Sequence, residues 1–248
     1  MRLKHALRRA AAALLLAAAG MAAAQAVPGA APTPPLAAVP VGDGRFALRV
    51  QGGRLWLQDS HGQPLRDWPL RDAQGQAGTV LAIFDAPLRR SFVVVLRDLA
   101  ELWEVSVDPA AEPIFDGWVH DYRMGEGLAR PGHLGLRRIR LARPLMAVFF
   151  DARVPWLVGA EPGEPSGNPP AVPLTAVVLH LDIRRVMAHL PLPDPPLPGP
   201  PLPNSALQPL DGTQLWREGG HWLLRLPAAS GWTVYDTQRW LPLRHEPR

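Results

Sequence analysis

The chain has 248 residues, 30 of them proline, with no cysteine and a formal net charge of +4 at pH 7. Without cysteine this sequence cannot form disulfides, attach a c-type haem covalently, build a cysteine zinc site or use thiol catalysis. Its single lysine, Lys4, lies near the N-terminus, so the rest of the chain offers no Schiff-base lysine, phosphate-loop lysine or Ser-Lys nucleophile pair.

Residues 1–26, MRLKHALRRAAAALLLAAAGMAAAQA, predict a cleaved secretory signal peptide. A basic start is followed by an apolar run from Ala10 to Ala19 and by the small-x-small ending Ala24-Gln25-Ala26. The apolar run is shorter than the ~20 residues that a membrane span needs. We therefore expect the protein in the periplasm or secreted, with no membrane span after cleavage of the leader.

This leader also carries the excess positive charge. Four of the 26 Lys and Arg residues lie in it and none of the 22 Asp and Glu residues, so 22 basic residues face 22 acidic ones in the remainder. A balanced chain lacks the excess cationic charge that draws a protein to phosphate backbones. The sequence therefore predicts no nucleic-acid partner.

After the leader, residues 27–44 are rich in Pro and Ala and predict an extended tether. The main domain is expected over residues 45–248, interrupted by two proline-rich loops at 161–173 and 191–203. Such proline density excludes helix and interior strand and favours polyproline II or turns. A ligand for a proline-reading domain is the alternative interpretation of these loops.

Between the proline-rich pieces, short apolar segments alternate with turn residues and are rich in β-branched and aromatic side chains, as in GRFALRVQGGRLWLQD and SFVVVLRDLAELWEVSVD. This pattern predicts strand pairs joined by tight turns and an all-β fold. Four units also align on an aspartate that follows a strand, namely Asp59, Asp108, Asp182 and Asp236.

Consecutive aspartates of this set are 49, 74 and 54 residues apart, near the ~40–50-residue period of a propeller blade. We therefore predict a β-propeller-like fold of about four to five antiparallel blades, and the sequence leaves open whether the ring is complete. Coincidental use of Asp in turns is the alternative, because Asp opens turns in many folds.

Polar chemistry is concentrated in one stretch, GWVHDYRMGEGLARPG, from Gly117 to Gly132. It follows a predicted strand, and Arg137 and Arg138 come shortly after it. Loops that leave a rigid sheet are where binding residues are often held. A capped turn at His120 and a solvated face at Arg137 and Arg138 are the structural alternatives.

Several segments, in order and spacing, resemble the haem d1 propeller family. They are RRSFVVVLRDLAELWEVS, IFDGWVHDYRMGEG, RRIRLARPLMAVFFDARVPWLVGA and VVLHLDIRRVMAHLPLPDPPLPG, which together cover roughly residues 89–199. The family comprises the d1 domain of cytochrome-type nitrite reductases and periplasmic propeller proteins that handle haem d1 during its biogenesis. The resemblance implies a shortened, diverged propeller that holds a haem d1 or related tetrapyrrole non-covalently.

The resemblance also implies site residues. Val119-His120-Asp121 matches a family His-Asp pair, which makes His120 the candidate metal ligand, and Arg130 is a further candidate partner for carboxylate side chains of the macrocycle. At the family's second distal histidine this chain has Leu197, which weakens an assignment as a nitrite reductase. The candidate cofactor-binding residues are His120, Asp121, Tyr122, Arg123, Arg137 and Arg138.

The predicted function is that of a periplasmic haem d1-related propeller protein, a non-catalytic tetrapyrrole-binding or biogenesis accessory with periplasmic redox or haem-biogenesis proteins as partners. Whether it is an enzyme stays open, and a non-catalytic role is favoured because the sequence has no HExxH, G-x-S-x-G or comparable catalytic motif. The alternative is a cofactor-free propeller remnant that acts as a protein-interaction module.

Overall fold

The computed structural model describes residues 36–40, 44–115, 129–163, 173–193 and 210–247. Almost all regular structure in this part of the chain is β-strand, and the helical element found there is the short 3-10 turn η1 (Pro87–Arg89). None of the described segments forms a helix with the length and hydropathy to cross a membrane. The all-β prediction is confirmed.

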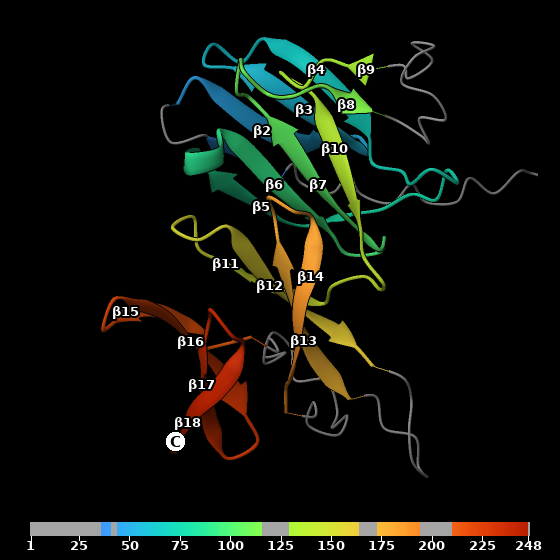
Figure 1. Ribbon diagram of the computed structural model, residues 1–248. Helices are drawn as coiled ribbons and strands as arrows, with labels where there is room; N and C mark the ends of the chain where they lie inside the picture. Colours follow the sequence, from blue (N-terminus) through green and yellow to red (C-terminus); the bar gives the residue numbers. More distant parts are fainter. Residues whose placement is uncertain (1–35, 41–43, 116–128, 164–172, 194–209, 248) are drawn as a thin grey trace, which may run out of the picture. The chain divides into compact units, whose positions relative to one another are not determined.

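Sixteen of the strands form four antiparallel four-stranded sheets (Figure 1). Sheet 1 contains β1 (Leu36–Pro40), β2 (Phe46–Gln51), β3 (Arg54–Asp59) and β4 (Pro64–Pro69). Sheet 2 contains β5 (Val80–Ala86), β6 (Ser91–Leu96), β7 (Glu101–Ser106) and β10 (Leu136–Arg140).

The third and fourth sheets repeat this organisation. Sheet 3 contains β11 (Ala147–Phe150), β12 (Trp156–Pro162), β13 (Leu174–His180) and β14 (Arg185–Pro191). Sheet 4 contains β15 (Gln214–Glu218), β16 (His221–Ala228), β17 (Gly231–Asp236) and β18 (Leu241–Pro247). Four sheets of this kind agree with the predicted four to five blades.

Strand β1 lies within residues 27–44, where the composition predicts a tether. It pairs antiparallel with β2, with Val39 opposite Leu48 and Pro40 opposite Ala47. An edge strand has one ladder of hydrogen bonds instead of two, which is why a proline is tolerated there. The rest of residues 27–44, apart from Gly44, lies outside the described residues.

The aspartate repeat marks the same place in every sheet. Asp59 and Asp236 are the last residues of β3 and β17, and Asp108 and Asp182 follow β7 and β13 by two residues, so each aspartate ends the third strand of its sheet. Asp59 Oδ1 accepts hydrogen bonds from the amides of His61 and Gln63, both at 2.9 Å. At Asp59 the cause is local: its carboxylate satisfies amides of the turn into the fourth strand.

Three hydrophobic cores join consecutive sheets. Alternate residues of each strand point to opposite faces, so one strand can serve two cores. In β6, Phe92 and Val94 pack in the core with sheet 1, whereas Val93 and Val95 pack in the core with sheet 3. A third core lies between sheets 3 and 4. Burial of each such side chain contributes about 1.5–3 kcal/mol, so these cores are what holds the sheets together.

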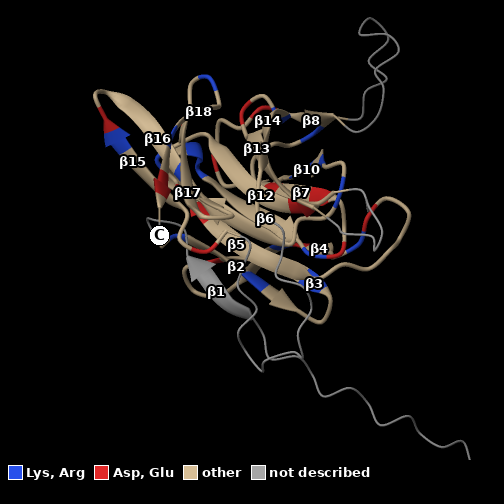
Figure 2. Cartoon of the chain, turned by 90° about the horizontal axis from the view of Figure 1, so that it is seen from below, with Lys and Arg blue, Asp and Glu red and all other residues tan. Residues whose placement is uncertain are grey.

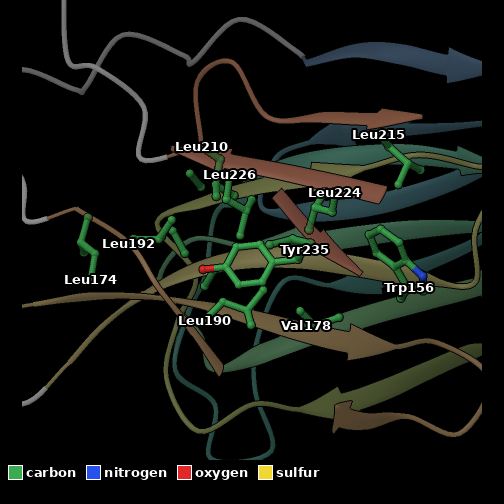
Figure 3. Close-up of a cluster of buried hydrophobic side chains, with 14 of the residues drawn as sticks. Trp156, Leu174, Val178, Leu190, Leu192, Leu210, Leu215, Leu224, Leu226 and Tyr235 are labelled. Carbon is green, nitrogen blue, oxygen red and sulfur yellow. The ribbon is translucent and has the colours of Figure 1, made fainter. Parts of the chain in front are cut away.

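Figure 3 shows the third core, where the ring of Tyr235 lies among leucines of both sheets. Only 3% of Tyr235 is exposed, and this burial raises the pKa of its hydroxyl above the ordinary value. Burial has this effect because it penalises the charged phenolate. The contribution of Tyr235 to the stability of the core between sheets 3 and 4 should therefore depend on pH.

We expect the protein to lose stability as the pH rises through about 10, the ordinary pKa of tyrosine. Above that pH the unfolded chain releases the Tyr235 proton while the folded chain retains it, so deprotonation favours unfolding. Below that pH both states keep the proton, and the stability of the folded state is not reduced by Tyr235. Urea unfolding at stepped alkaline pH measures the effect. Tyr235→Phe should flatten the dependence of the unfolding free energy on pH. The chain has two tyrosines, so the variant keeps Tyr122, and any alkaline dependence that Tyr122 causes remains in it. An unchanged slope would show that Tyr235 is not responsible.

Candidate functional site

The link between the third and fourth strands is long in sheet 2 alone. It spans residues 107–135, against 60–63, 181–184 and 237–240 in the other sheets. Part of it forms a small separate sheet of β8 (Ile114–Phe115) and β9 (Ala129–Arg130), in which Phe115 and Ala129 are register partners. The outgoing and the returning ends of the link therefore lie side by side, and β10 follows the returning end.

Residues 116–128, between these two short strands, lie outside the described residues. Four of the predicted site residues belong to this segment: His120, Asp121, Tyr122 and Arg123. Their roles stay predictions. The structure does describe the two ends of the segment and the residues around them, including the predicted Arg137 and Arg138.

Two glycines allow backbone to approach closely within this long link, and one of them brings its return path against its outgoing path. A Cβ on Gly132 would collide with the backbone carbonyl oxygens of Ala111 and Glu112. A Cβ on Gly135 would come within 2.5 Å of the Pro131 oxygen. Glycine is needed at both positions because backbone, which cannot move aside as a side chain can, occupies the space. The close approach places the Glu112 carbonyl beside β10.

A cavity of about 1130 Å³ opens at this place. We call it the arginine cavity, because five arginines line it with two glutamates, several apolar residues and one tryptophan: Arg130, Arg137, Arg138, Arg140, Arg184, Glu101, Glu112, Ala73, Pro113, Ile114, Phe115, Leu136 and Trp68. The structure thus brings together the predicted Arg130, Arg137 and Arg138.

Arg138 is held by two buried groups of β7. Its guanidinium carbon lies 4.7 Å from the ring centroid of Trp103, and Nη1 lies 3.7 Å from Glu101 Oε2. The indole nitrogen of Trp103 donates to the same Glu101 oxygen at 2.7 Å. Trp103 is fully buried and Glu101 is 8% exposed. Stacking and ion pairing together fix the plane of the guanidinium, a condition for bidentate recognition of a carboxylate.

Arg137 extends the positive charge on the same strand. Its Nη2 donates to the Glu112 carbonyl at 2.5 Å. Burial lowers the pKa of Arg137 most, and repulsion from the nearby Arg184 guanidinium lowers it further. Both causes act against its charged form, and the attraction of a bound anion would offset them. Acidic residues on β7 lie beside basic residues on β10 in this region (Figure 2).

A second network lies behind Arg137, in a smaller cavity of about 310 Å³ that Arg137 also lines. Arg89 donates from Nε and Nη2 to Glu104 Oε1 at 3.0 and 2.8 Å, and from Nη1 to Asp182 of the link after β13. Ser91 Oγ donates to the same Glu104 oxygen at 3.0 Å. Arg89 thus connects sheet 2 with sheet 3 and neutralises a buried carboxylate.

The described residues contain no group of three or more His, Cys, Asp and Glu side chains arranged to hold a metal ion. His180 Nδ1 lies 4.0 Å from Asp182, and His189 Nε2 lies 3.8 Å from Glu161, so these two histidines have different carboxylate partners. The metal-ligand role predicted for His120 falls outside the described residues.

Sequence reasoning missed five polar or aromatic residues of the cavity: Glu101, Glu112, Arg140, Arg184 and Trp68. Arg140 lies only two residues beyond Arg138 on β10, so the alternation of strand faces was a usable signal for it. Trp68 lies on β4 in sheet 1 and Arg184 follows β13 in sheet 3. No local pattern could have assigned these two, because only the packing of three sheets brings them to one cavity.

Comparison with known proteins identifies a relative. No family model matches the chain. It is 29% identical over 207 residues to the dihydro-haem d1 dehydrogenase of Pseudomonas aeruginosa, a match that covers 82% of this chain and 34% of the relative. Among solved structures, dihydro-haem d1 dehydrogenase NirN in complex with DHE matches with a TM-score of 0.58 and 26% identity, covering 88% of this chain and 39% of that one.

The Neurospora crassa Pan2 WD40 domain is a more distant structural match, with a TM-score of 0.40 and 8% identity. The chain spans about a third of the length of the curated relative that it matches. The predicted resemblance to the haem d1 group is confirmed by these two matches. The chain is thus similar in sequence and in fold to dihydro-haem d1 dehydrogenase, and its four described four-stranded sheets agree with the predicted propeller-like architecture.

Proposed function

We propose that the protein binds a haem d1-type tetrapyrrole non-covalently in the arginine cavity and serves as a carrier or biogenesis accessory in the periplasm. The observation that carries the proposal is the convergence of five guanidiniums with Trp68 and an apolar wall in one cavity of a haem d1-type propeller homologue. The solved relative in complex with DHE supports the choice of ligand class.

The described residues fit such a ligand in two respects. Guanidiniums form bidentate, charge-assisted hydrogen bonds with carboxylates, the groups that a tetrapyrrole carries on its rim. Trp68, Ile114 and Phe115 offer apolar surface to the flat macrocycle. The cavity volume of about 1130 Å³ lies slightly above the usual ~300–1,000 Å³ of ligand pockets, which suits a large planar ring.

Each described side chain then has a defined task. Arg138, oriented by Trp103 and Glu101, anchors one carboxylate from one face of β10, and Arg137 anchors another from the opposite face of this edge strand. A bound haem-type group would supply a redox-active metal and a chromophore, and His120 is the proposed ligand to that metal. We restrict the proposal to binding and transfer, because the chain matches about a third of the relative whose name describes a dehydrogenase.

An absorption titration of the purified protein with haem d1 or protohaem tests this function. We expect a saturable shift of the Soret band. The double variant Arg137→Ala/Arg138→Ala should weaken binding by about tenfold or more, because it removes two hydrogen-bonded charges. His120→Ala should change the position of the band and leave binding measurable. Arg185→Gln, on β14 and outside the cavity lining, is the control and should bind like the wild type. Absence of any shift would reject the proposal.

The outer face of sheet 4 favours a second candidate, a cofactor-free interaction module. On this sheet Leu215 and Leu224 face sheet 3, so the adjacent Trp216 and Arg225 face away from that core. Arg244 lies 5.9 Å from the Trp216 ring and Arg225 lies 4.7 Å from the Trp232 ring. Trp216, Trp232 and Arg225 are half-buried and Arg244 is exposed, and Trp and Arg are among the residues that most often dominate protein interfaces. Recovery from periplasm of one specific partner without a chromophore, abolished by Trp216→Ala, would support this candidate.

A further inference from the structure

Exposed apolar side chains gather at one end of the four sheets. We call it the aspartate end, because the four repeated aspartates lie there; it carries the links from the first to the second strand and from the third to the fourth strand of each sheet. Among the described residues nine large hydrophobic side chains are exposed. Eight of them lie in these links or within three residues after them: Leu65, Leu88, Phe115, Ile183, Val186, Met187, Leu241 and Leu243.

The ninth exposed residue, Met146, precedes β11 and lies at the opposite end. Single exposed hydrophobic residues scattered over a surface need no explanation, but their concentration at one end does.

The aspartate ends of sheets 2, 3 and 4 adjoin one another. Arg89 of η1 pairs with Asp182 of the β13–β14 link, which joins the ends of sheets 2 and 3. The ring of Trp156, at the start of β12, meets the ring of Trp240 in the β17–β18 link edge to face at 5.0 Å, which joins the ends of sheets 3 and 4. The exposed apolar residues of three sheets therefore belong to one surface.

Each of these apolar links also carries an exposed arginine. These are Arg90 beside Leu88 in sheet 2, Arg185 beside Ile183 in sheet 3 and Arg239 beside Leu241 in sheet 4. Arg90 forms a largely exposed pair with Asp108 at 3.3 Å. Within the described residues Arg185 and Arg239 have no ion pair or side-chain hydrogen bond. Their guanidiniums can therefore bind an external anion such as a phosphate.

The β13–β14 link keeps an arginine where glycine would fit the backbone better. Arg184 has a φ of 54°, whereas the corresponding link of sheet 1 places Gly62 in the left-handed region, with a φ of 78°. A residue with a Cβ is less stable than glycine in this conformation. Asp182 in the same link is already paired with Arg89. An arginine retained at a strained position favours a role for its charge.

We propose that the aspartate end docks on the surface of an anionic lipid bilayer. Leu88, Ile183 and Leu241 enter the boundary of the acyl chains, and the neighbouring arginines bind lipid phosphates while their aliphatic stems lie in the apolar layer. Separate apolar side chains on links of three sheets suit a fluid bilayer, which closes around each of them. A protein partner would need a contiguous, well-packed apolar core instead. The proposal does not depend on a bound tetrapyrrole.

Sedimentation with large unilamellar vesicles tests the proposal, with protein that is expressed with its leader and purified after cleavage. One set of vesicles is phosphatidylcholine alone, and the other is phosphatidylcholine with phosphatidylglycerol at about 3:1. We expect a partition coefficient at least about fivefold higher on the anionic vesicles, because the lipid charge attracts each exposed arginine. In about 0.5 M salt the difference should shrink, because exposed charges are screened.

The apolar contribution is tested with Leu88→Ser/Ile183→Ser. This variant should bind the anionic vesicles about tenfold or more weakly than the wild type, because two apolar side chains no longer enter the acyl region. Met146→Ser is the matched control: its side chain is 50% exposed at the opposite end, and the variant should bind like the wild type. All variants share the same N-terminus, so any effect of residues near it cancels.

The charge contribution is tested with Arg185→Gln/Arg239→Gln, which should reduce the preference for anionic vesicles to about twofold or less. Arg71→Gln removes one exposed arginine in the β4–β5 link at the opposite end and should keep the preference. Absence of sedimentation with both kinds of vesicle would overturn the proposal. So would equal losses in Met146→Ser and Leu88→Ser/Ile183→Ser, and so would a protein partner cross-linked at this end while vesicles stay unbound.

Discussion

Replacement of Arg89 by alanine is expected to lower the free energy of unfolding by about 3–5 kcal/mol, the usual cost of removing one partner of a buried ion pair. The Glu104 side chain is 7% exposed and that of Arg89 is 18% exposed. Arg89 donates twice to Glu104 and also reaches Asp182 and the Leu181 carbonyl, so its loss leaves a buried carboxylate without its cation and cuts a link between sheets 2 and 3.

A double-mutant cycle separates these two effects. Glu104→Gln removes the uncompensated charge, so Arg89→Ala should cost less in the Glu104→Gln background than in the wild type. Arg90→Ala is the matched control: it removes the neighbouring arginine, whose 3.3 Å pair with Asp108 is largely exposed, and should cost no more than about 1 kcal/mol. Urea unfolding followed by tryptophan fluorescence gives the four free energies of the cycle and that of the Arg90→Ala control. Equal losses for Arg89 and Arg90 would contradict burial as the cause.

The repeating aspartate could be predicted from sequence because its cause is local. Asp59, Asp108 and Asp236 each accept a hydrogen bond from the amide two residues further on, within a single turn. Asp182 has the same place in its sheet, but its carboxylate pairs with Arg89, far away in the sequence. Local pattern thus located all four strand ends and could not foresee that one of the four aspartates joins two sheets.

The candidate site was predictable to a similar extent. Arg137 and Arg138 follow the polar loop closely, and the resemblance to the haem d1 propeller family makes them candidate ligand-binding residues; the structure shows that both line one cavity. The spacing of Glu101 and Glu104 predicts opposite faces of one strand, and their partners agree: Glu101 binds Trp103, whereas Glu104 binds Ser91 and Arg89. The spacing did not reveal that one face opens into the cavity while the other meets sheet 3, because that depends on which sheets become neighbours.

Strand β1 escaped prediction for a different reason. Its residues, LAAVP, have little β-propensity and end in a proline, so composition favours an extended tether. The strand forms because β2 offers an unpaired edge, and backbone hydrogen bonds need no particular side chains. Sequence patterns report what side chains require, and they are therefore weakest for edge strands held mainly by the backbone.

Trp103 is the residue at which the core and the site meet, and Trp103→Ala is expected to cost about 3–5 kcal/mol of unfolding free energy. The side chain is fully buried in the core between sheets 1 and 2, so its removal leaves a large cavity. Its loss also frees Arg138 from the stacked position and takes a hydrogen bond from the buried Glu101. The tetrapyrrole binding that we propose should therefore weaken together with stability.

Trp103→Phe distinguishes the two contributions, because it keeps most of the buried ring and removes the N–H donor. We expect a loss of about 1–3 kcal/mol, the cost of leaving a buried acceptor without its partner. Glu101→Gln in the Trp103→Phe background should recover part of it, since a neutral amide tolerates burial better than a carboxylate. A loss in Trp103→Phe as large as that in Trp103→Ala would show that the hydrogen bond, and not the volume of the ring, dominates.

Sheet 4 supplies the same triad of Trp, Glu and Arg in an exposed setting. Trp216 donates to Glu218 at 3.2 Å, and Arg244 lies 5.9 Å from the Trp216 ring. The hydrogen bond from Trp216, followed by the charge of Arg244, lowers the pKa of Glu218. Trp216→Ala should therefore raise that pKa toward its ordinary value, observable by NMR, with a much smaller loss of stability than Trp103→Ala. Comparable losses of unfolding free energy in Trp216→Ala and Trp103→Ala would mean that burial does not determine how much this triad stabilises the protein. Burial could then not explain the large effect expected for Trp103.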